Sequence, residues 1–434
     1  MISISKRTFY KAITVASLGV AIAAISSPGT VVTELLSPFS LPLVLLVPGV
    51  LAYLSLTKSA LVDLRACLYG AGLSAALLMA LGFVINLGYR VFYGDPLRSV
   101  PVWIGFSLLL LALGYSIDRF VPGDEIEIAF PASVTPYLFT SIPIAAGVGA
   151  LLVEGGGTNV VILLVLGVIL LLYIVGSFDS SERAILIYCI ALALLIHNTL
   201  ISEFLLWGDQ AKEANLVYHV LQAGHWDPAE LSRANKAVML RIVILHPVHK
   251  LLTGLDIRHV FKIAHPLLFA MAPVALYRAF ADRGRVQTGY LGAGTLMFFF
   301  SFFTVLARNT RTAIAILFII LFVKVLLDTE IPRRVRRILL AIFGSSVFVS
   351  HYGAGYMYLA ILGGGIVGSL AGRKLIDTQR RRVREQLRFI PVLLIAFVSF
   401  GWYTYIPPRS ATLGTVVGFV VDFANRLQEG FFQP

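Results

Sequence analysis

Long apolar runs recur along almost the whole chain, and no other feature of the sequence constrains its fold as strongly. A helix of about 17 to 25 apolar residues is long enough to cross the hydrocarbon core of a bilayer. Hydrophobic residues make up 58% of the 434 residues and charged residues only 13%, which is not the composition of a soluble globular chain. The sequence therefore predicts an all-α, polytopic membrane protein.

The apolar runs predict a bundle of roughly thirteen membrane spans. The connecting segments become richer in polar residues after the sixth span. We therefore divide the chain into an N-terminal membrane module, residues 1–183, and a second membrane module, residues 184–434. The predicted spans cover residues 9–26, 39–56, 66–88, 100–117, 136–153, 159–176, 184–201, 261–280, 289–305, 312–327, 338–350, 356–371 and 389–405.

Basic side chains are concentrated in alternate loops between the predicted spans. These basic segments are residues 6–11, 278–285, 332–337 and 373–388. Because Lys and Arg accumulate in cytoplasmic loops, the pattern predicts a multi-pass protein of the cell membrane with a cytoplasmic N-terminus. The polar interval 202–259 then forms one large extracytoplasmic loop. The net charge of +12 reflects orientation and contact with anionic lipid headgroups, rather than nucleic-acid binding.

The extracytoplasmic loop carries two acids on one face of a predicted short helix. Gly208 and Gly224 suit the two ends of this helix, and Asp209 and Glu213 are four residues apart within it. The same face continues through the apolar residue Val217, so we expect both carboxylates to point toward protein or membrane surface. A buried carboxylate must be paired or functional. In the competing interpretation, Asp209 is a helix N-cap and Glu213 a partner of the helix dipole or of a nearby basic side chain.

A second short helix is predicted between Pro247 and Gly254. It carries His246 and His249, which are three residues apart. Two neutral imidazoles on one face, together with a nearby carboxylate, are a common metal-binding arrangement. No acid stands at helical spacing from them, so the pair also fits two polar side chains at the membrane interface.

Basic residues around this loop supply candidates for binding a phosphate. Lys250 and Arg258 either extend their charged ends to the membrane interface or neutralise a lipid phosphate. Arg308 and Arg311 lie in a short outer turn, and two guanidinium groups suit a phosphate or diphosphate. His351 lies in another outer turn. We expect both turns to converge on the acid-bearing loop, although these residues could instead simply mark the ends of spans.

Four motifs between residues 184 and 371 carry a resemblance to known proteins. They are W-G-D-x-x-x-E-A-x-L-V, G-H-W-D-P, I-L-H-P-V-x-K-L-L-T-G-L-D-I-R-H-V-F-K-I-A-H-P and V-S-H-Y-G-A-G-Y. Together they resemble an archaeal family of multi-pass membrane proteins that is itself similar to the GT-C glycosyltransferase superfamily. The resemblance implies a GT-C-like enzyme that moves a sugar from a polyprenyl-phosphate-linked donor to an acceptor on the extracytoplasmic face.

The resemblance also implies roles for individual residues. Asp209 matches the acid that serves as general base, and Glu213 would orient it or bind a divalent cation. That cation is the one candidate cofactor, since no Walker or dinucleotide fingerprint occurs. The expected partners are membrane lipid and a polyprenyl-phosphate-linked sugar. The candidate substrate-binding residues are Trp207, Trp226, Arg241, His246, Lys250, Arg258, Arg308, Arg311 and His351.

A non-catalytic membrane protein is the alternative from another class. It would be a lipid-linked-saccharide transporter or a scaffold for cell-envelope assembly. A transporter predicts charged residues along a path through the membrane, whereas the predicted spans contain few ionisable residues. A purely structural subunit is a third interpretation. It predicts that salt bridges fully occupy Asp209 and Glu213 and that no cavity adjoins them.

Overall fold

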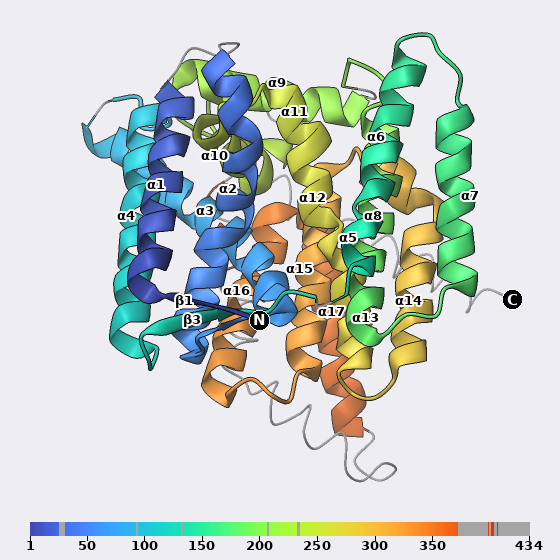
Figure 1. Ribbon diagram of the computed structural model, residues 1–434. Coiled ribbons are helices and arrows are strands. Elements are labelled where there is room, and N and C mark those ends of the chain that lie inside the picture. The colour runs from blue at the N-terminus through green and yellow to red at the C-terminus, as the bar shows by residue number, and fades with distance from the viewer. Residues whose placement is uncertain are drawn as a thin grey trace, which may run out of the picture.

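The fold is almost entirely helical. The computed structural model describes residues 1–25, 31–92, 94–131, 133–205, 208–231, 235–371, 398, 401–402 and 406. In this part of the chain, long helices run side by side as a bundle, and shorter helices lie across one end of it (Figure 1). The predicted all-α class is confirmed at this level.

Helices form in each interval that the apolar runs of the N-terminal module predict. Helix α8 begins where Asp179 caps it, because the Asp179 carboxylate accepts hydrogen bonds from the backbone N–H groups of Ser181 and Glu182. The bounds are α1 (Lys6–Ile25), α2 (Val31–Thr57), α3 (Leu64–Phe92), α4 (Ser99–Phe120), α5 (Thr135–Phe139), α6 (Ser141–Glu154), α7 (Val160–Val175) and α8 (Ser180–Thr199).

The described chain after α8 combines long helices with short ones, and the division into two modules stays a prediction. Its α-helices are α9 (Gly208–Ala223), α10 (His246–Thr253), α11 (Ile257–His259), α12 (His265–Phe269), α13 (Met271–Ala281), α14 (Val286–Phe298), α15 (Thr310–Leu327), α16 (Arg333–Ser350) and α17 (Tyr352–Ala371). One 3-10 helix, η1 (Asn235–Val238), and three π-helices, η2 (Arg241–Leu245), η3 (Val260–Ala264) and η4 (Phe302–Leu306), connect them in the described residues.

Seven helical segments of the described chain are long and apolar enough to cross a membrane. They are Ser40–Thr57, Leu64–Gly88, Ser99–Phe120, Thr135–Glu154, Ser180–Thr199, Ile257–Ala281 and Thr310–Leu327. The other predicted intervals up to residue 371 are also helical, whereas the predicted interval 389–405 lies largely outside the described residues. The total of roughly thirteen spans and the GT-C-like topology stay predictions.

A small sheet, which the sequence analysis did not anticipate, ties the N-terminus to the segment after α4. Strand β3 (Glu125–Ile128) lies between β1 (Ile2–Ser5) and β2 (Leu61–Val62), antiparallel to β1 and parallel to β2. In this register Ile2 lies opposite Ile128. The alternating Glu-Ile-Glu-Ile sequence of β3 is typical of a strand, but it is too short to be distinguished from a loop.

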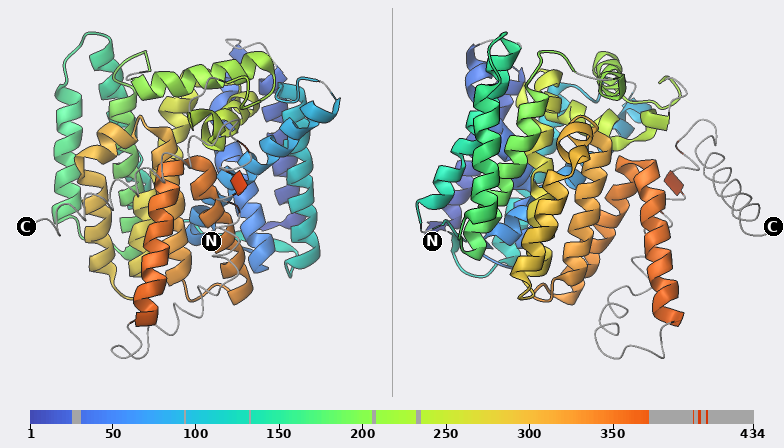
Figure 2. Two further views of the ribbon diagram at one scale, coloured as in Figure 1. Left: turned by 180° about the vertical axis from the view of Figure 1, so that it is seen from behind. Right: turned by 90° about the vertical axis from the view of Figure 1, so that its right-hand side faces the viewer.

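The two ends of the bundle differ in character. The helix α9 lies across one end, and the small sheet lies toward the opposite end (Figures 1 and 2). The turn between α13 and α14 and the turn between α15 and α16, which carry several of the arginines, also lie at the sheet end. We refer to these as the α9 end and the sheet end.

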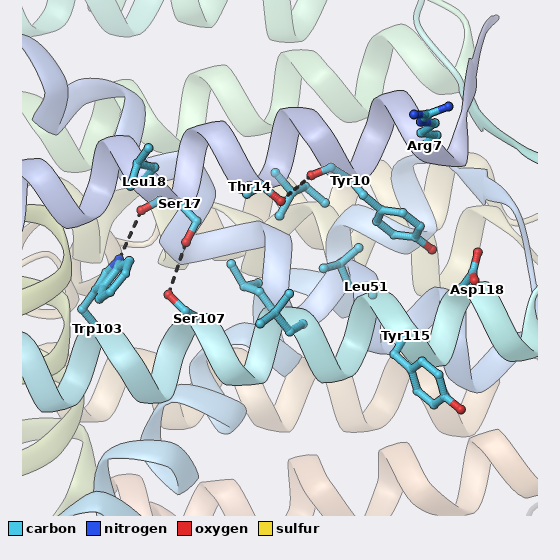
Figure 3. Close-up of a pocket in the computed structure, with 14 residues that line it drawn as sticks. Arg7, Tyr10, Thr14, Ser17, Leu18, Leu51, Trp103, Ser107, Tyr115 and Asp118 are labelled. Carbon is cyan, nitrogen blue, oxygen red and sulfur yellow. Dashed lines mark hydrogen bonds between the residues drawn. The ribbon is translucent and has the colours of Figure 1, made fainter.

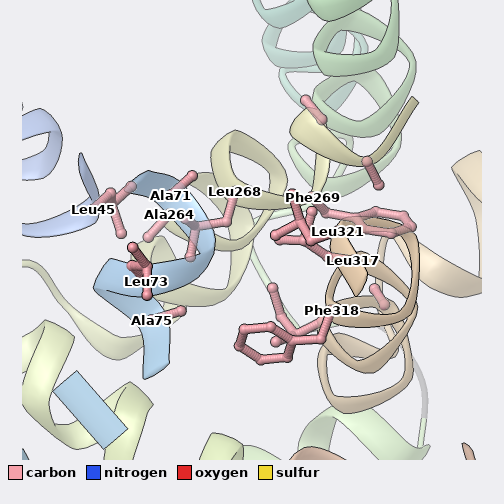
Figure 4. Packing of buried hydrophobic residues seen from close by; sticks show 14 of the residues in the cluster. Leu45, Ala71, Leu73, Ala75, Ala264, Leu268, Phe269, Leu317, Phe318 and Leu321 are labelled. Carbon is pink, nitrogen blue, oxygen red and sulfur yellow. The ribbon is translucent and has the colours of Figure 1, made fainter. Parts of the chain in front are cut away.

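The core of the bundle surrounds α15. Leu317 and Phe318 of α15 are fully buried, and they pack near Leu268 and Phe269 of α12 (Figure 4). On the other side Gly72 of α3 allows a close approach, because a Cβ atom at this position would collide with a leucine of α15. This packing fixes α15, and with it the charged side chains at its two ends.

Candidate functional site

The helix α9 forms where the sequence predicts it and ends at Gly224, which takes a φ of +71°. Glycine adopts such a conformation without strain. Asp209 lies in the first turn with its side chain 52% exposed, and Glu213 lies one turn later with its side chain 0% exposed. Val217 and Val220 are buried on the same face. The prediction that the acids share an inward face is confirmed for Glu213, and Asp209 lies at the edge of that face.

One guanidinium joins the two carboxylates. Arg311, in the first turn of α15, places Nη1 2.6 Å from Glu213 Oε1 and Nη2 2.9 Å from Asp209 Oδ2. Its side chain is 9% exposed. Contacts between a guanidinium and a carboxylate are shorter and stronger than neutral hydrogen bonds. Because α15 is fixed in the core, Arg311 sets the positions of both acids relative to the bundle.

The remaining carboxylate oxygens contact two further residues. Lys236 of η1 places Nζ 2.5 Å from Asp209 Oδ1, and the hydroxyl of Thr310 donates a hydrogen bond of 2.8 Å to Glu213 Oε2. Each of the four carboxylate oxygens therefore has a partner. We refer to Asp209, Glu213, Lys236, Thr310 and Arg311 as the acid cluster.

The two acids have different electrostatic character. Burial raises the pKa of Glu213 to about 7, and the positive charge of Arg311 offsets this only in part. The hydrogen bond from Lys236 lowers the pKa of Asp209, an effect that outweighs partial burial and that the charge of Arg311 reinforces. Asp209 is therefore ionised at neutral pH, whereas Glu213 titrates near neutral pH.

A second guanidinium, fully buried, adjoins the acid cluster. Arg241 of η2 is 0% exposed, and its Nη2 lies 3.5 Å from His265 Nδ1. Its Nε and Nη1 have no hydrogen-bond partner among the described residues. Burial lowers the pKa of Arg241 to about 9, an effect that the Glu213 carboxylate opposes. Buried donors without partners are costly, so these nitrogens are suited to receive an anion or ordered water.

Two histidines of α10 lie in the same buried region. His246 Nδ1 lies 2.8 Å from the carbonyl oxygen of Arg241, and its ring stacks on Phe261. His246 Nε2 and both ring nitrogens of His249 lack partners within the described part of the chain. Burial and then the charge of Arg241 lower the pKa of both histidines, so both are neutral. No group of three His, Cys, Asp or Glu side chains among the described residues could hold a metal ion.

One of the two predicted outer turns contributes Arg311 to the acid cluster, and the other carries His351. His351 lies between α16 and α17, and its Nδ1 accepts a hydrogen bond of 3.0 Å from the backbone N–H of Ala354. Burial lowers the pKa of His351 to about 4, and the charge of Arg311 contributes in the same direction. Arg308 is directed toward α8, where its Nε donates to Asn198 Oδ1 at 2.8 Å.

Two other basic candidates lie apart from the acid cluster. Arg258 pairs through Nε with Asp256 Oδ1 at 3.0 Å and through Nη1 with Glu203 Oε1 at 3.5 Å. Lys250 is half-buried, and burial lowers the pKa of its ammonium group. Their predicted contact with a substrate phosphate stays a prediction.

The two tryptophan candidates have different outcomes. Trp226 is buried, and its Nε1 donates a hydrogen bond of 2.8 Å to the carbonyl oxygen of Ala237. Its backbone also exchanges hydrogen bonds with the side chain of Asn86. Trp226 thereby anchors the segment that carries Lys236. Trp207 lies outside the described residues.

Sequence reasoning missed three residues of this region. Lys236 stands in an irregular segment where no periodicity indicates its partner. Thr310 directly precedes Arg311, and its position at the start of an apolar run could have indicated a polar contact. His265 belongs to the I-A-H-P motif, but its contact with Arg241 depends on how η2 and α12 pack.

The arrangement places an ionised, half-exposed carboxylate beside two cations. A third cation, Arg241, acts on Glu213 and lacks full hydrogen bonding. Such a site can accept a proton from a bound hydroxyl group and stabilise a nearby anion. No protein-family model, curated protein or solved structure matches the chain.

Proposed function

We propose that the protein is an integral-membrane glycosyltransferase that moves a sugar from a polyprenyl-phosphate-linked donor to an acceptor on the extracytoplasmic face. The observation that carries this proposal is the exposed, ionised Asp209 carboxylate, held by Arg311 and Lys236 at the α9 end. The arginine-rich turns at the sheet end favour a cytoplasmic position for that end.

Asp209 acts as the general base in the proposed reaction. The hydroxyl oxygen of the acceptor forms a bond to the anomeric carbon of the sugar, and the bond from that carbon to the lipid phosphate oxygen breaks. The hydroxyl proton passes to the Asp209 carboxylate, and the negative charge leaves with the lipid phosphate. Because Lys236 Nζ donates a hydrogen bond to Asp209 Oδ1, the acceptor hydroxyl displaces this ammonium group from Oδ1 before transfer.

Cations of the same buried region stabilise the departing phosphate. Arg311 Nε and Arg241 Nε and Nη1 are buried nitrogens without hydrogen-bond partners among the described residues. Both guanidinium groups act on Glu213, so one phosphate-binding site can draw on both. Guanidinium groups match the geometry of phosphate oxygens and remain charged. In this proposal, Glu213 positions Arg311 and does not contact the substrate.

One observation favours a structural subunit instead. All four carboxylate oxygens of Asp209 and Glu213 have partners, as expected for residues that only hold α9 on α15. The two interpretations differ in what the loss of Asp209 should do. A general base affects transfer, whereas a salt bridge that is half exposed affects stability, and only slightly.

Asp209→Asn tests the proposed function directly. Asparagine keeps the size of the side chain but removes its basicity, so we expect transfer to fall by a factor of about 10² to 10⁴, the usual contribution of a general base. Transfer is measured in purified membranes with a radiolabelled polyprenyl-phosphate-linked sugar. Thermal unfolding in detergent is measured in parallel, and we expect little change.

Asp95→Asn is the matched control. Asp95 is also a half-exposed carboxylate, 53% exposed, that pairs with an arginine, Arg98. We expect this variant to transfer sugar at nearly the native rate. If Asp209→Asn transfers as fast as the native protein, Asp209 has no catalytic role. If Asp209→Asn loses stability and Asp95→Asn does not, the structural interpretation is favoured.

A further inference from the structure

A groove runs between α1 and α4, on the side of the bundle. Its volume is about 680 Å³, which is within the range of ligand-binding pockets. None of its lining residues belongs to the acid cluster. Only 22% of the apolar stretch of α4 that is long enough to cross a membrane is buried inside the protein. This side of the bundle therefore faces the surrounding bilayer.

The lining of the groove changes along its length (Figure 3). Arg7, Tyr10, Tyr115 and Asp118 lie at one end, near the sheet end of the bundle. The middle is lined mainly by aliphatic side chains, among them Leu51. A polar mouth followed by an apolar channel matches a lipid, whose headgroup lies at the interface and whose chain lies in the hydrocarbon core.

The far end of the groove is closed by hydrogen bonds within the protein. Trp103 Nε1 donates to the carbonyl oxygen of Ser17 at 3.2 Å, and the hydroxyl groups of Ser17 and Ser107 lie 3.5 Å apart. These contacts connect α1 to α4 and satisfy the polar groups there. An apolar chain in the channel therefore leaves these polar groups with their hydrogen-bond partners inside the protein.

The mouth, by contrast, carries polar groups without partners. Neither Arg7 nor Asp118 forms a salt bridge with a described residue, and both are exposed. The hydroxyl oxygen of Tyr10 is buried and has no hydrogen-bond partner in the described part of the chain. The mouth thus offers one cation on α1, one anion on α4 and a phenolic donor between them.

We propose that this groove binds one phospholipid whose headgroup carries both a phosphate and a primary ammonium group. Arg7 binds the phosphate, Asp118 accepts hydrogen bonds from the ammonium group, and Tyr10 donates to a phosphate or ester oxygen. One acyl chain occupies the channel between α1 and α4. This lipid is a bound component of the protein and takes no part in the proposed sugar transfer.

Gly114 gives a means of closing the groove. It lines the groove, and a Cβ atom there would meet only the ring of Tyr10, at an ordinary contact distance of 3.5 Å. A leucine at this position extends into the space that the acyl chain would occupy. Gly114→Leu should therefore block the channel without disturbing the packing of α4 against the core.

Lipid competition in the purified full-length protein tests the proposal. The protein is delipidated, reconstituted with equal amounts of phosphatidylethanolamine, phosphatidylglycerol and phosphatidylcholine, and the retained lipid is quantified by native mass spectrometry. We expect one retained phosphatidylethanolamine. Asp118→Asn should lower the preference for phosphatidylethanolamine over phosphatidylglycerol about fivefold, and Arg7→Gln should weaken both lipids by about the same factor. Gly114→Leu should abolish retention of all three.

Arg119→Gln is the matched control, because Arg119 is an exposed cation beside Asp118 that does not line the groove. It should retain lipid like the native protein, and Asp209→Asn should do the same. Equal retention of the three lipids by the native protein would overturn the proposal, as would a preference for phosphatidylglycerol alone. Undiminished retention in Gly114→Leu, with a native elution profile, would place the lipid outside the groove.

Discussion

The two ends of α15 carry the same kind of charge cluster in two different environments. At the α9 end, Arg311 joins Glu213 to Asp209, and the Asp209 side chain is 52% exposed. At the sheet end, Lys324 also joins two carboxylates, and neither is more than 13% exposed. One helix thus holds a closed cluster at one end and a cluster with an open carboxylate at the other.

The closed cluster has several partners for each charge. Lys324 Nζ lies 2.9 Å from Asp282 Oδ2 and 3.3 Å from Asp328 Oδ2. The hydroxyl of Tyr69 donates to the same Asp328 oxygen at 2.8 Å, and Arg65 Nε lies 3.6 Å from it. These contacts connect α15 to α3 and to the segment that follows α13, so the cluster fixes the helices at this end.

The comparison distinguishes the Lys324 cluster, whose charges stabilise the fold, from the acid cluster, which leaves a carboxylate able to react with a bound molecule. A buried ion is tolerated only when its partners replace the lost hydration, and the Lys324 cluster meets this condition with buried partners. The acid cluster meets it for Glu213 but leaves Asp209 at the surface and Arg241 with unpaired nitrogens. Loss of charge should therefore destabilise the protein at the sheet end and impair function at the α9 end.

Lys324→Met should have the largest effect on stability. It removes the cation that Asp282 and Asp328 share, so that Asp282 keeps only Arg278 and Asp328 only Arg65 among the described ion pairs. Breaking a buried ion pair costs about 3 to 5 kcal/mol. We expect a large drop in the unfolding temperature of the detergent-solubilised protein, measured by intrinsic fluorescence. Arg258→Gln is the control, because Arg258 pairs at the surface and is 42% exposed. It should cost less than about 1 kcal/mol. Equal losses in the two variants would contradict the distinction between the clusters.

Glu213→Gln should change how stability depends on pH. The pKa of Glu213 is raised from its ordinary value of 4.5 to about 7, so the folded protein binds this proton more tightly than the unfolded chain does. The free energy of unfolding should then fall as the pH rises from 4.5 to 7, by about 1.4 kcal/mol for each pH unit in this window. Glutamine removes this slope. Thermal unfolding between about pH 5 and 8 measures the difference.

His351 changes stability in the opposite direction within an overlapping range, because its pKa is lowered to about 4. Because His351 stays neutral in the folded protein while the unfolded chain is already protonated, the free energy of unfolding decreases as the pH falls. This contribution is present in the native protein and in Glu213→Gln, so it cancels in the comparison. Parallel pH curves for the two proteins would mean that Glu213 stays ionised and that Arg311 outweighs burial.

Lys236→Gln should have the smallest effect of these variants, and it should change the pH dependence of sugar transfer rather than stability. The hydrogen bond from Lys236 is the main cause of the lowered pKa of Asp209. Without it the pKa of Asp209 rises, so the base becomes protonated at a higher pH. The acidic limb of the pH–rate profile should move to higher pH, while the unfolding temperature changes little. An unmoved acidic limb would show that a group other than Asp209 controls it.

Local signals in the sequence were enough to predict the elements that frame the site. Gly224 ends α9, and Gly254 ends α10 with a φ of +72°. The predicted start of α10 at Pro247 is wrong, because the helical backbone enters α10 directly from η2. The helical spacing of Glu213 and Val217 correctly placed the carboxylate on a buried face. These features depend on neighbours within one or two turns, which is the range over which sequence patterns are informative.

Contacts between distant segments could not be predicted in the same way. The approach of Arg311 to α9 followed from the expected convergence of outer turns, but the positions of Lys236 and Arg241 depend on how η1 and η2 pack. Trp226 was a candidate for binding substrate, and its buried hydrogen bond to Ala237 cannot be read from an aromatic residue in a polar loop. Long-range packing decides these contacts, and composition does not encode it.

The small sheet has a consequence for the order in which the chain assembles. Because Ile2 pairs with Ile128, β1 has no partner strand until the ribosome has synthesised everything through β3. Helix α1 also packs on α2, the next helix in the chain, so it can be held in the bilayer before the strand that anchors β1 exists. The sheet can therefore form only after the chain from α1 through α4 has been made.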